Sequence, residues 1–162
     1  MAYKIKYLDG SIKEFDSLVG ANLRRSNLSF INLSYTDLSY ANLSEANLNN
    51  ANLNFAHLFG VNLNHSNLRY SYLNGADLSG ADLSYANLSC VNLSKANLNK
   101  ANLSYAYLVR VNLNEANLSY ANLNGVILYK AKINKTNFSG ANLDGVDLSE
   151  ADYSQSILDC FI

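Results

Sequence analysis

The pattern of hydrophobic and polar residues repeats every five residues over most of the chain. From Ala21 to Cys160 the sequence divides into 28 consecutive pentapeptides without insertion or deletion. The unit reads Ala-Asn-Leu-Ser/Asn-X, and its residues are numbered here as positions one to five. Position three is Leu in 25 of the 28 units, with Ile133, Phe138 and Tyr153 as exceptions, and position two is Asn or Asp in 22. Self-similarity at a fixed period indicates a repeat architecture.

A period of five is incompatible with both a regular helix and a long strand. Each helical residue turns by about 100°, so successive leucines would spiral around the whole helix. The in-out-in pattern of Ala-Asn-Leu suits a short strand, but an odd period would reverse the faces at every repeat. The chain must therefore turn once per repeat. Ser or Asn at position four and Gly at position five favour turns, and those glycines are Gly60, Gly75, Gly80, Gly125, Gly140 and Gly145. We predict a solenoid of stacked coils about 4.8 Å apart.

This repeated unit resembles the A(D/N)LXX motif of the pentapeptide-repeat family over 28 units of five residues, or 140 of the 162 residues. The resemblance implies an all-β fold, a right-handed quadrilateral parallel β-helix with four repeats per coil. The spacing alone predicts one corner per repeat but does not fix the number of corners in a coil. With four, the chain forms about seven coils. Leucines then stack from residue n to n+20, as in the column Leu23, Leu43, Leu63, Leu83, Leu103, Leu123 and Leu143. Position-two Asn faces outward and forms ladders between coils.

The two ends of a solenoid have to be covered, and both ends of this chain depart from the repeat. The segment Tyr3–Tyr7 alternates apolar and charged residues, and Asp9-Gly10 follows as a turn signal. We expect residues 1–20 to form a strand or hairpin cap, residues 21–160 to form the β-helix, and residues 161–162 to form a C-terminal cap or dimer contact. Leu18 is already in phase with the repeats.

The C-terminal residues are unusually apolar: Ile157, Leu158, Phe161 and Ile162. Phe161 falls on position one, which is normally Ala, so it either plugs the end of the core or forms an end-to-end dimer contact. The family resemblance adds weight to the second interpretation, because several relatives dimerise through this end. Both interpretations stay open at this stage.

Composition and charge argue against a nucleic-acid-binding protein and against a membrane-spanning protein. The net charge is −1, with 12 basic and 13 acidic residues, which does not fit a strongly basic nucleic-acid-binding protein. No apolar run approaches the roughly 18 residues of a membrane span. The first residues contain no apolar signal core, so we expect a cytoplasmic protein. The abundance of Asn points weakly to an AT-rich bacterial genome.

The sequence offers no catalytic or cofactor-binding motif. We find no Ser-His-Asp order, phosphate-binding glycine loop or paired carboxylates, and no insertion interrupts the repeats. His57 and His65 fall on adjacent faces of the expected fold and are interpreted as ordinary surface residues, without a metal. Cys90 and Cys160 are too far apart on this fold for a disulfide, so both are predicted to be free thiols. We expect a non-enzymatic protein without a cofactor.

The informative exceptions lie on the predicted surface. Tyr107 and Ile127 replace position-two Asn in successive coils of one face, and Val109 and Tyr129 replace polar position-four residues there. Arg110 and Lys130 edge this group. It is either packing that stiffens the face or a site for a partner. Two further pairs 20 residues apart, Tyr35–Phe55 and Tyr85–Tyr105, are expected to stack locally.

Two functions follow from these observations. The first is a protein-protein interaction scaffold of unknown partner, motivated by the regular rod and the apolar group at Tyr107 to Lys130. The second is implied by the family resemblance: binding DNA gyrase or topoisomerase IV as a DNA mimic, related to quinolone resistance. Mimicry of duplex DNA over about 34 Å would need roughly 20 negative charges. Residues 91–140 instead carry six basic and one acidic residue, and the five acids of residues 141–162 lie at one end. Direct binding to nucleic acid or a membrane is not expected.

Overall fold

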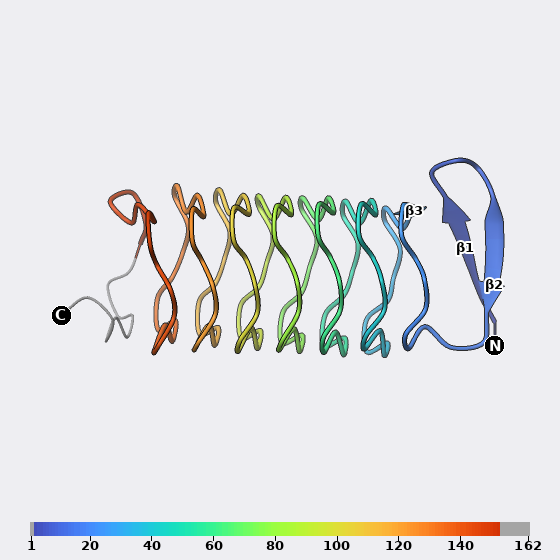
Figure 1. The fold of residues 1–162 in the computed structure, drawn as a ribbon, viewed down its shortest axis with the longest axis horizontal. Helices are drawn as coiled ribbons and strands as arrows, with labels where there is room; N and C mark the ends of the chain where they lie inside the picture. The colour runs from blue at the N-terminus through green and yellow to red at the C-terminus, as the bar shows by residue number, and fades with distance from the viewer. Residues whose placement is uncertain (1, 153–162) are drawn as a thin grey trace.

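The structure is a computed structural model that describes residues 2–152. A hairpin is followed by coils stacked along one axis (Figure 1). Parallel β-bridges join each position-two residue to the residue 20 positions later, from Asn22↔Asn42 to Lys132↔Asp152. Four pentapeptides therefore complete one coil, which confirms the predicted quadrilateral β-helix. The sides that start with the position-two residues Asn22, Asn27, Asn32 and Asp37 are called faces 1 to 4.

The N-terminal hairpin continues the β-structure of the first coil. Strands β1 (Tyr3–Tyr7) and β2 (Ile12–Phe15) pair antiparallel, and β1 also pairs antiparallel with β3 (Ser26–Asn27), giving the sheet order β2-β1-β3. The side chains of Ile5 and Tyr7 are buried against the leucine core, because alternate residues of β1 face inward. Leu18 is also buried, so the core extends to residues before Ala21.

The composition of the pentapeptide follows from where its five N–H groups donate. In the unit Ala41–Glu45, the N–H of Asn42 donates to the previous coil at 2.9 Å, and those of Leu43 and Glu45 donate to the next coil at 2.7 and 2.9 Å. The N–H of Ala46, which opens the next unit, closes the turn onto the carbonyl of Leu43 at 3.1 Å. The remaining N–H, of Ser44, donates to the side-chain Oδ1 of Asn42 at 3.1 Å. Asn at position two therefore completes the backbone bonding of the corner.

Each corner also requires an unusual backbone conformation at position five. Every fifth residue from Gly20 to Gly145 has a φ between 55° and 71°, and 19 of these residues are not glycine. A positive φ at the third residue of a turn closed by an i to i+3 hydrogen bond is the pattern of a type II turn. Side chains with a Cβ are strained there by about 1–2 kcal/mol. The strain persists because the hydrogen bonds of the adjacent coils fix the corner.

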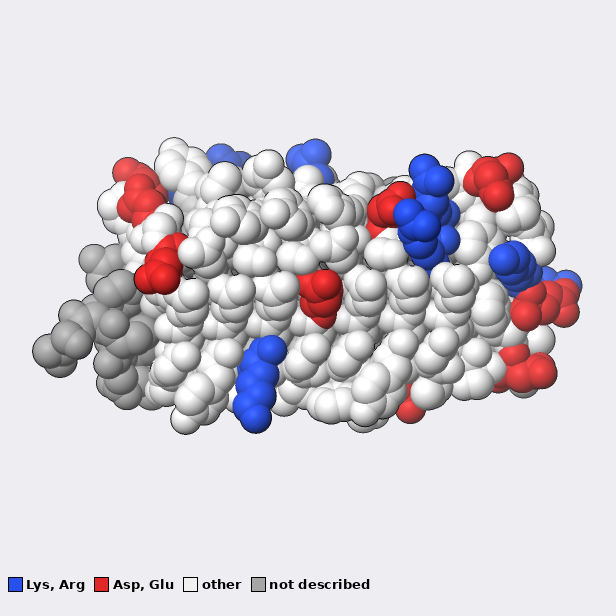
Figure 2. Space-filling view, viewed as in Figure 1, with Lys and Arg blue, Asp and Glu red and all other residues white. Residues whose placement is uncertain are grey.

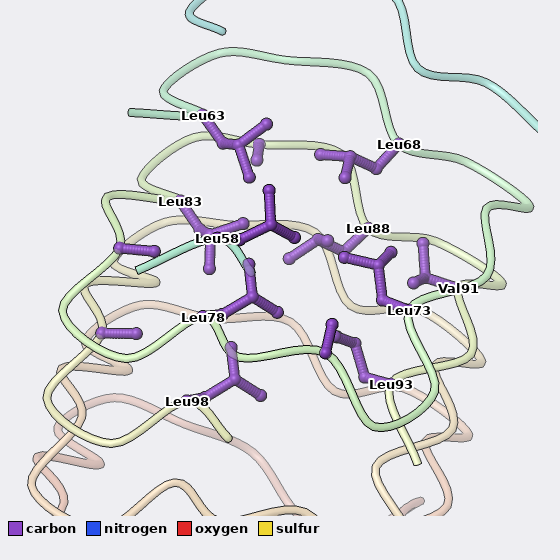
Figure 3. Close-up of a cluster of buried hydrophobic side chains, with 14 of the residues drawn as sticks. Leu58, Leu63, Leu68, Leu73, Leu78, Leu83, Leu88, Val91, Leu93 and Leu98 are labelled. Carbon is purple, nitrogen blue, oxygen red and sulfur yellow. The ribbon is translucent and has the colours of Figure 1, made fainter. Parts of the chain in front are cut away.

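The core consists of columns of leucine, as Figure 3 shows for the pairs Leu63 and Leu83 and Leu68 and Leu88. These side chains are at most 1% exposed, and position-one residues such as Val91 fill the space beside them. The predicted stacking from n to n+20 is confirmed. Leu143 is only partly buried, because the described core ends close to this residue.

The outward-facing Asn residues form the predicted ladders. On face 4, Asn97 donates from Nδ2 to Asp77 at 3.0 Å, Asn117 donates to Asn97 at 3.2 Å, and Asn137 donates to Asn117 at 3.2 Å. The same Oδ1 atoms accept from the corner N–H of their own repeat. Position-two Asn therefore stabilises both the corner and the contact between coils.

Candidate protein-interaction surface

The surface residues singled out by the sequence lie together on face 2. The bridge series of this face runs Asn87, Tyr107, Ile127 and Asp147, so Tyr107 and Ile127 occupy neighbouring coils. Tyr107, Ile127 and Tyr129 have exposed fractions of 50, 45 and 46%, and Val109 is half-buried. These four side chains are called the apolar patch. It interrupts a face on which polar ladders are the rule.

The apolar patch gives up hydrogen bonds that the repeat normally makes. Because Tyr107 and Ile127 have no side-chain acceptor that reaches the following corner, the N–H groups of Val109 and Tyr129 lose their usual partner. Among the described residues, neither N–H donates to another protein group. The residue below Tyr129 in the preceding coil is Val109, whose side chain has no acceptor either. The stability of the coil therefore does not explain these substitutions.

Two other position-two exceptions are compensated. Tyr72 on face 3 also replaces Asn, but the N–H of Asn74 donates instead to Oδ1 of Asn54 in the preceding coil, at 2.9 Å. The corner after Lys132 uses the same substitute bond at 3.0 Å. Tyr72 is as exposed as Tyr107, with 52% of its surface accessible. At Tyr72 the neighbouring coil therefore replaces the lost hydrogen bond. At Tyr107 and Ile127 it does not.

A column of stacked aromatic rings borders the apolar patch. At the corner before face 2, His65 stacks on Tyr85 with centroids 4.9 Å apart, and Tyr85 stacks on Tyr105 at 5.3 Å. The predicted Tyr85–Tyr105 stacking is confirmed, as is Tyr35–Phe55 at 5.2 Å on another corner. Sequence reasoning missed that this column adjoins the patch, since Tyr105 and Tyr107 flank one corner. The 20-residue spacing of His65 and Tyr85 was the available signal.

A shallow depression continues the apolar patch toward the C-terminal end. It has a volume of about 310 Å³ and is lined by Gly125, Ile127, Tyr129, Gly145 and Glu150, among others. Gly125 and Gly145 leave this space open because they have no side chains. Its position was not predicted, because it depends on which glycines fall above one another in neighbouring coils.

Charged groups edge the apolar patch on one side. Arg110 and Lys130 occupy consecutive levels of the corner after face 2, and the Lys130 Nζ lies 5.1 Å from the centre of the Tyr129 ring. At the depression, hydrogen bonds from the backbone and side chain of Ser149 lower the pKa of Asp147 below its ordinary value of 3.8. The patch thus combines aromatic area with a basic edge at Arg110 and Lys130 and with acidic groups, Asp147 and Glu150, at the depression.

The structure does not bring the two histidines into one site. His57 pairs between Asp37 and Asp77 on face 4, an arrangement that sequence reasoning overlooked, while His65 belongs to the aromatic column. The N–H of Phe59, two residues after His57, also has no protein acceptor among the described residues, and the Phe59 side chain is 43% exposed. Its ring packs edge-on against Tyr40 of the preceding coil, with the ring centroids 5.2 Å apart, whereas face 2 has two such corners in neighbouring coils. Within residues 2–152 there is no group of three or more His, Cys, Asp or Glu side chains suited to a metal.

Cys90 is a free thiol, whereas Cys160 lies outside the described residues. So do the C-terminal candidates Ile157, Leu158, Phe161 and Ile162. In the part of the chain that the structure covers, no helix has the length and apolar character needed to cross a bilayer.

The known proteins that this chain resembles include one family profile and several solved structures. A family profile described as Pentapeptide repeats (8 copies) matches residues 17–54, 26–64, 62–99, 92–129 and 128–159. Alr5209, a pentapeptide repeat protein from Nostoc PCC 7120, is 38% identical over 53% of this chain and 69% of its own, with a TM-score of 0.50. HetL, a pentapeptide repeat protein involved in heterocyst differentiation regulation in the cyanobacterium Nostoc sp. strain PCC 7120, is 26% identical over 89% and 87%, with a TM-score of 0.40. QnrB1, a plasmid-mediated fluoroquinolone resistance protein, is 20% identical over 81% of both chains, with a TM-score of 0.46. A search of curated protein sequences found no match.

Proposed function

Because the chain belongs to the pentapeptide repeat family, we propose that it is a non-enzymatic scaffold that binds a protein partner through the apolar patch of face 2. The regular coils hold the patch rigid, so binding orders few side chains and loses little conformational entropy. In this proposal the N-terminal segment, residues 1–20, serves as a cap, and the coils of residues 21–160 present the surface.

The observation that carries the proposal is the uncompensated loss of Asn on face 2. Tyr107 and Ile127 remove the acceptors of two corners, and they place large apolar side chains in solvent. Exposed aromatic groups beside arginine are typical of protein interfaces, where they act as anchors. A residue pattern that weakens the coil and exposes apolar surface is best explained by a contact outside the coil.

The edges of the apolar patch suggest the chemistry of the partner. Arg110 and Lys130 both lie on the corner that follows face 2. A partner with an apolar centre and carboxylates on the matching side would complement this arrangement. The depression beside Tyr129 and Gly145 has room for an apolar side chain of that partner.

The test is capture of partners by three matched baits. The first is the wild-type chain, the second carries Tyr107→Asn, Ile127→Asn and Tyr129→Ser, and the third carries Tyr72→Asn. We expect a protein that the wild type and Tyr72→Asn retain equally, and that the triple variant retains at least about 10-fold less when binding is repeated with purified components. Equal retention by all three baits would eliminate the apolar patch as the binding site.

The triple variant should remain folded, because its substitutions restore the repeat consensus. The asparagine side chains introduced by Tyr107→Asn and Ile127→Asn would again supply the acceptors for the following corners. We therefore expect a urea midpoint equal to or above that of the wild type. Circular dichroism at matched concentrations checks that lost binding does not reflect unfolding.

Binding to DNA gyrase or topoisomerase IV remains the alternative that the family raises. A DNA mimic needs dense negative charge, whereas this chain has 13 acidic residues opposed by 12 basic ones. Lys130 and Lys132 moreover place positive charge in the same stretch of the rod as the patch. We therefore expect neither inhibition nor protection of gyrase in a supercoiling assay at micromolar protein, and activity there would replace the scaffold proposal.

Homodimerisation through Ile157, Leu158, Phe161 and Ile162 is a separate proposal, independent of the apolar patch. Light scattering of the full chain and of a chain truncated after Asp159 tests it. A dimer that becomes monomeric on truncation supports the contact, and a full-length monomer removes it.

We also propose that the protein is located in the bacterial cytoplasm, a reducing compartment in which the Cys90 thiol stays free.

A further inference from the structure

A cleft lies between the N-terminal hairpin and the first coil. Its volume is about 500 Å³, and its lining includes Tyr7, Leu8, Lys13, Arg24 and Arg25. Small-molecule sites in proteins typically have volumes of roughly 300–1,000 Å³ and combine apolar walls with a few placed polar groups. The cleft falls within this range of volumes, but its lining is more polar, because only Tyr7 and Leu8 are apolar residues beside five polar or charged ones. The proposed scaffold function makes no use of it.

Hydrogen bonds fix the walls of this cleft relative to each other. The N–H of Leu8 in the hairpin donates to the carbonyl of Arg25 in the first coil at 2.9 Å. The Oη of Tyr7 donates to the carbonyl of Asn22 at 2.7 Å, and the Tyr7 side chain is buried. A ligand would therefore enter a preformed cleft, which limits the entropy lost on binding.

Two arginines beside the cleft share a single carboxylate. The Nε atoms of Arg24 and Arg25 each lie 3.2 Å from an oxygen of Glu45 in the next coil, and a terminal nitrogen of Arg24 also contacts that carboxylate. Hydrogen bonding from Arg24, followed by the charges of both arginines, lowers the pKa of Glu45. Each guanidinium has five N–H donors, so one carboxylate leaves several donors for another anion.

The third cation and the nearby acid are also held in place. The Nζ of Lys13 lies 5.0 Å from the centre of the Tyr7 ring. Asp9 accepts from the backbone N–H and the hydroxyl of Ser11 at 2.9 and 2.7 Å, and these bonds lower its pKa. Three cations against the carboxylate of Asp9 give the lining a net charge of +2, which falls to +1 when Glu45, paired with both arginines, is included. Basic and acidic groups lie side by side toward this N-terminal end in Figure 2.

We propose that this cleft binds a small soluble anion that carries two or more negative charges on its phosphate groups. The paired guanidinium groups of Arg24 and Arg25 suit phosphate oxygens, which arginine recognises through two parallel hydrogen bonds. Tyr7 and Leu8 provide an apolar wall for the organic part of the molecule. Glu45 acts as an internal competitor that occupies the arginines until the phosphate displaces it.

Titration with inorganic pyrophosphate tests the proposal on the full chain, at an ionic strength held constant with sodium chloride. Amide shifts in two-dimensional NMR spectra report both the site and the affinity. We expect shifts concentrated at Tyr7–Lys13 and Asn22–Arg25, and affinity at least about 5-fold lower for Arg25→Gln and for Lys13→Gln. Glu45→Gln should raise the affinity, because it releases both arginines from their shared carboxylate.

The matched control is Glu115→Gln, which removes an acid paired with Lys95 at 3.9 Å on a different corner. It should leave the affinity unchanged, whereas a general effect of net charge would raise the affinity as much as Glu45→Gln does. Pyrophosphate shifts that are absent, spread over all lysines and arginines, or unaffected by Arg25→Gln would overturn the proposal. Binding to vesicles that contain phosphatidic acid, without any response to pyrophosphate, would assign the cleft to a lipid headgroup and would also overturn it. None of these outcomes depends on the apolar patch.

Discussion

The contribution of a stacked aromatic ring to the free energy of unfolding can be measured by comparing two corner glycines, Gly75 and Gly80. Only Gly75 lies next to a ring. Their φ values are nearly identical, +65° and +66°. A Cβ added at Gly75 would lie 2.6 Å from ring atoms of Phe55, whereas a Cβ at Gly80 would meet no atom within 4 Å. Substitution by Ala therefore imposes the same backbone strain at both corners but a steric clash only at Gly75.

The expected free energies follow from this difference. Placing Ala at a positive φ costs about 1–2 kcal/mol, and the smaller entropy of the unfolded chain offsets about 0.4–1 kcal/mol of that cost. Gly80→Ala should thus destabilise the fold by about 1 kcal/mol. Gly75→Ala also displaces the Phe55 ring from its stack on Tyr35, an interaction of about 0.5–1.5 kcal/mol beyond area burial. We therefore expect Gly75→Ala to lower the free energy of unfolding by about 0.5–1.5 kcal/mol more than Gly80→Ala does.

A double-mutant cycle isolates the ring contact. In a Phe55→Ala background, Gly75→Ala should cost no more than Gly80→Ala, because the ring that opposes the new Cβ is absent. Urea denaturation followed by circular dichroism measures each free energy, with the slope of the transition checked for every variant. Equal costs at Gly75 and Gly80 in the wild-type background, or an excess cost that survives removal of Phe55, would refute the reasoning.

Three further predictions concern the core and the charged corner. Leu83→Ala should lower the free energy of unfolding by about 2–5 kcal/mol, because Leu83 is 1% exposed in a mid-stack column; a loss below about 1 kcal/mol in urea denaturation would contradict its place in the core. Ser71→Ala should stabilise the fold by about 1 kcal/mol, because the buried Ser71 hydroxyl has no hydrogen-bond partner among the described residues. Ser66→Ala should not stabilise it, because the Ser66 hydroxyl donates to a carbonyl at 2.6 Å. Equal effects of the two substitutions in the same assay would contradict this difference in hydrogen bonding. The folded-state pKa of Glu45 is lowered from 4.5, so its stabilising contribution is present above pH 4.5 and is lost as the pH falls through the folded-state pKa. The stability difference between wild type and Glu45→Gln should therefore vanish in acid, and a difference independent of pH would exclude this linkage.

The candidate site could be located from the sequence only once the length of the coil was known. A coil of 20 residues places Tyr107 under Ile127 and Val109 under Tyr129, and the structure has this arrangement. The repeat also predicted that Asn is the rule at position two, which is why these residues stood out. The sequence could not show whether such an exception is compensated. That depends on the side chain present in the neighbouring coil, as Asn54 demonstrates for the corner after Tyr72.

The five-residue period, read by itself, determined that the chain turns once per repeat, that leucine fills the core and that Asn faces outward, because these properties follow from the local alternation of apolar and polar residues. Only the tertiary structure decided that the side chain of position-two Asn bonds the corner N–H, and that the corner residues from Gly20 to Gly145 adopt a positive φ. It alone also placed Arg24 and Arg25 beside Glu45 and formed the cleft with the hairpin. The contacts of Glu45 join residues about 20 positions apart, the cleft joins a cap to a coil, and the corner bond of Asn forms within one repeat once the turn has closed. Their geometry depends on how the chain closes each turn, and the pattern within one repeat does not contain that information.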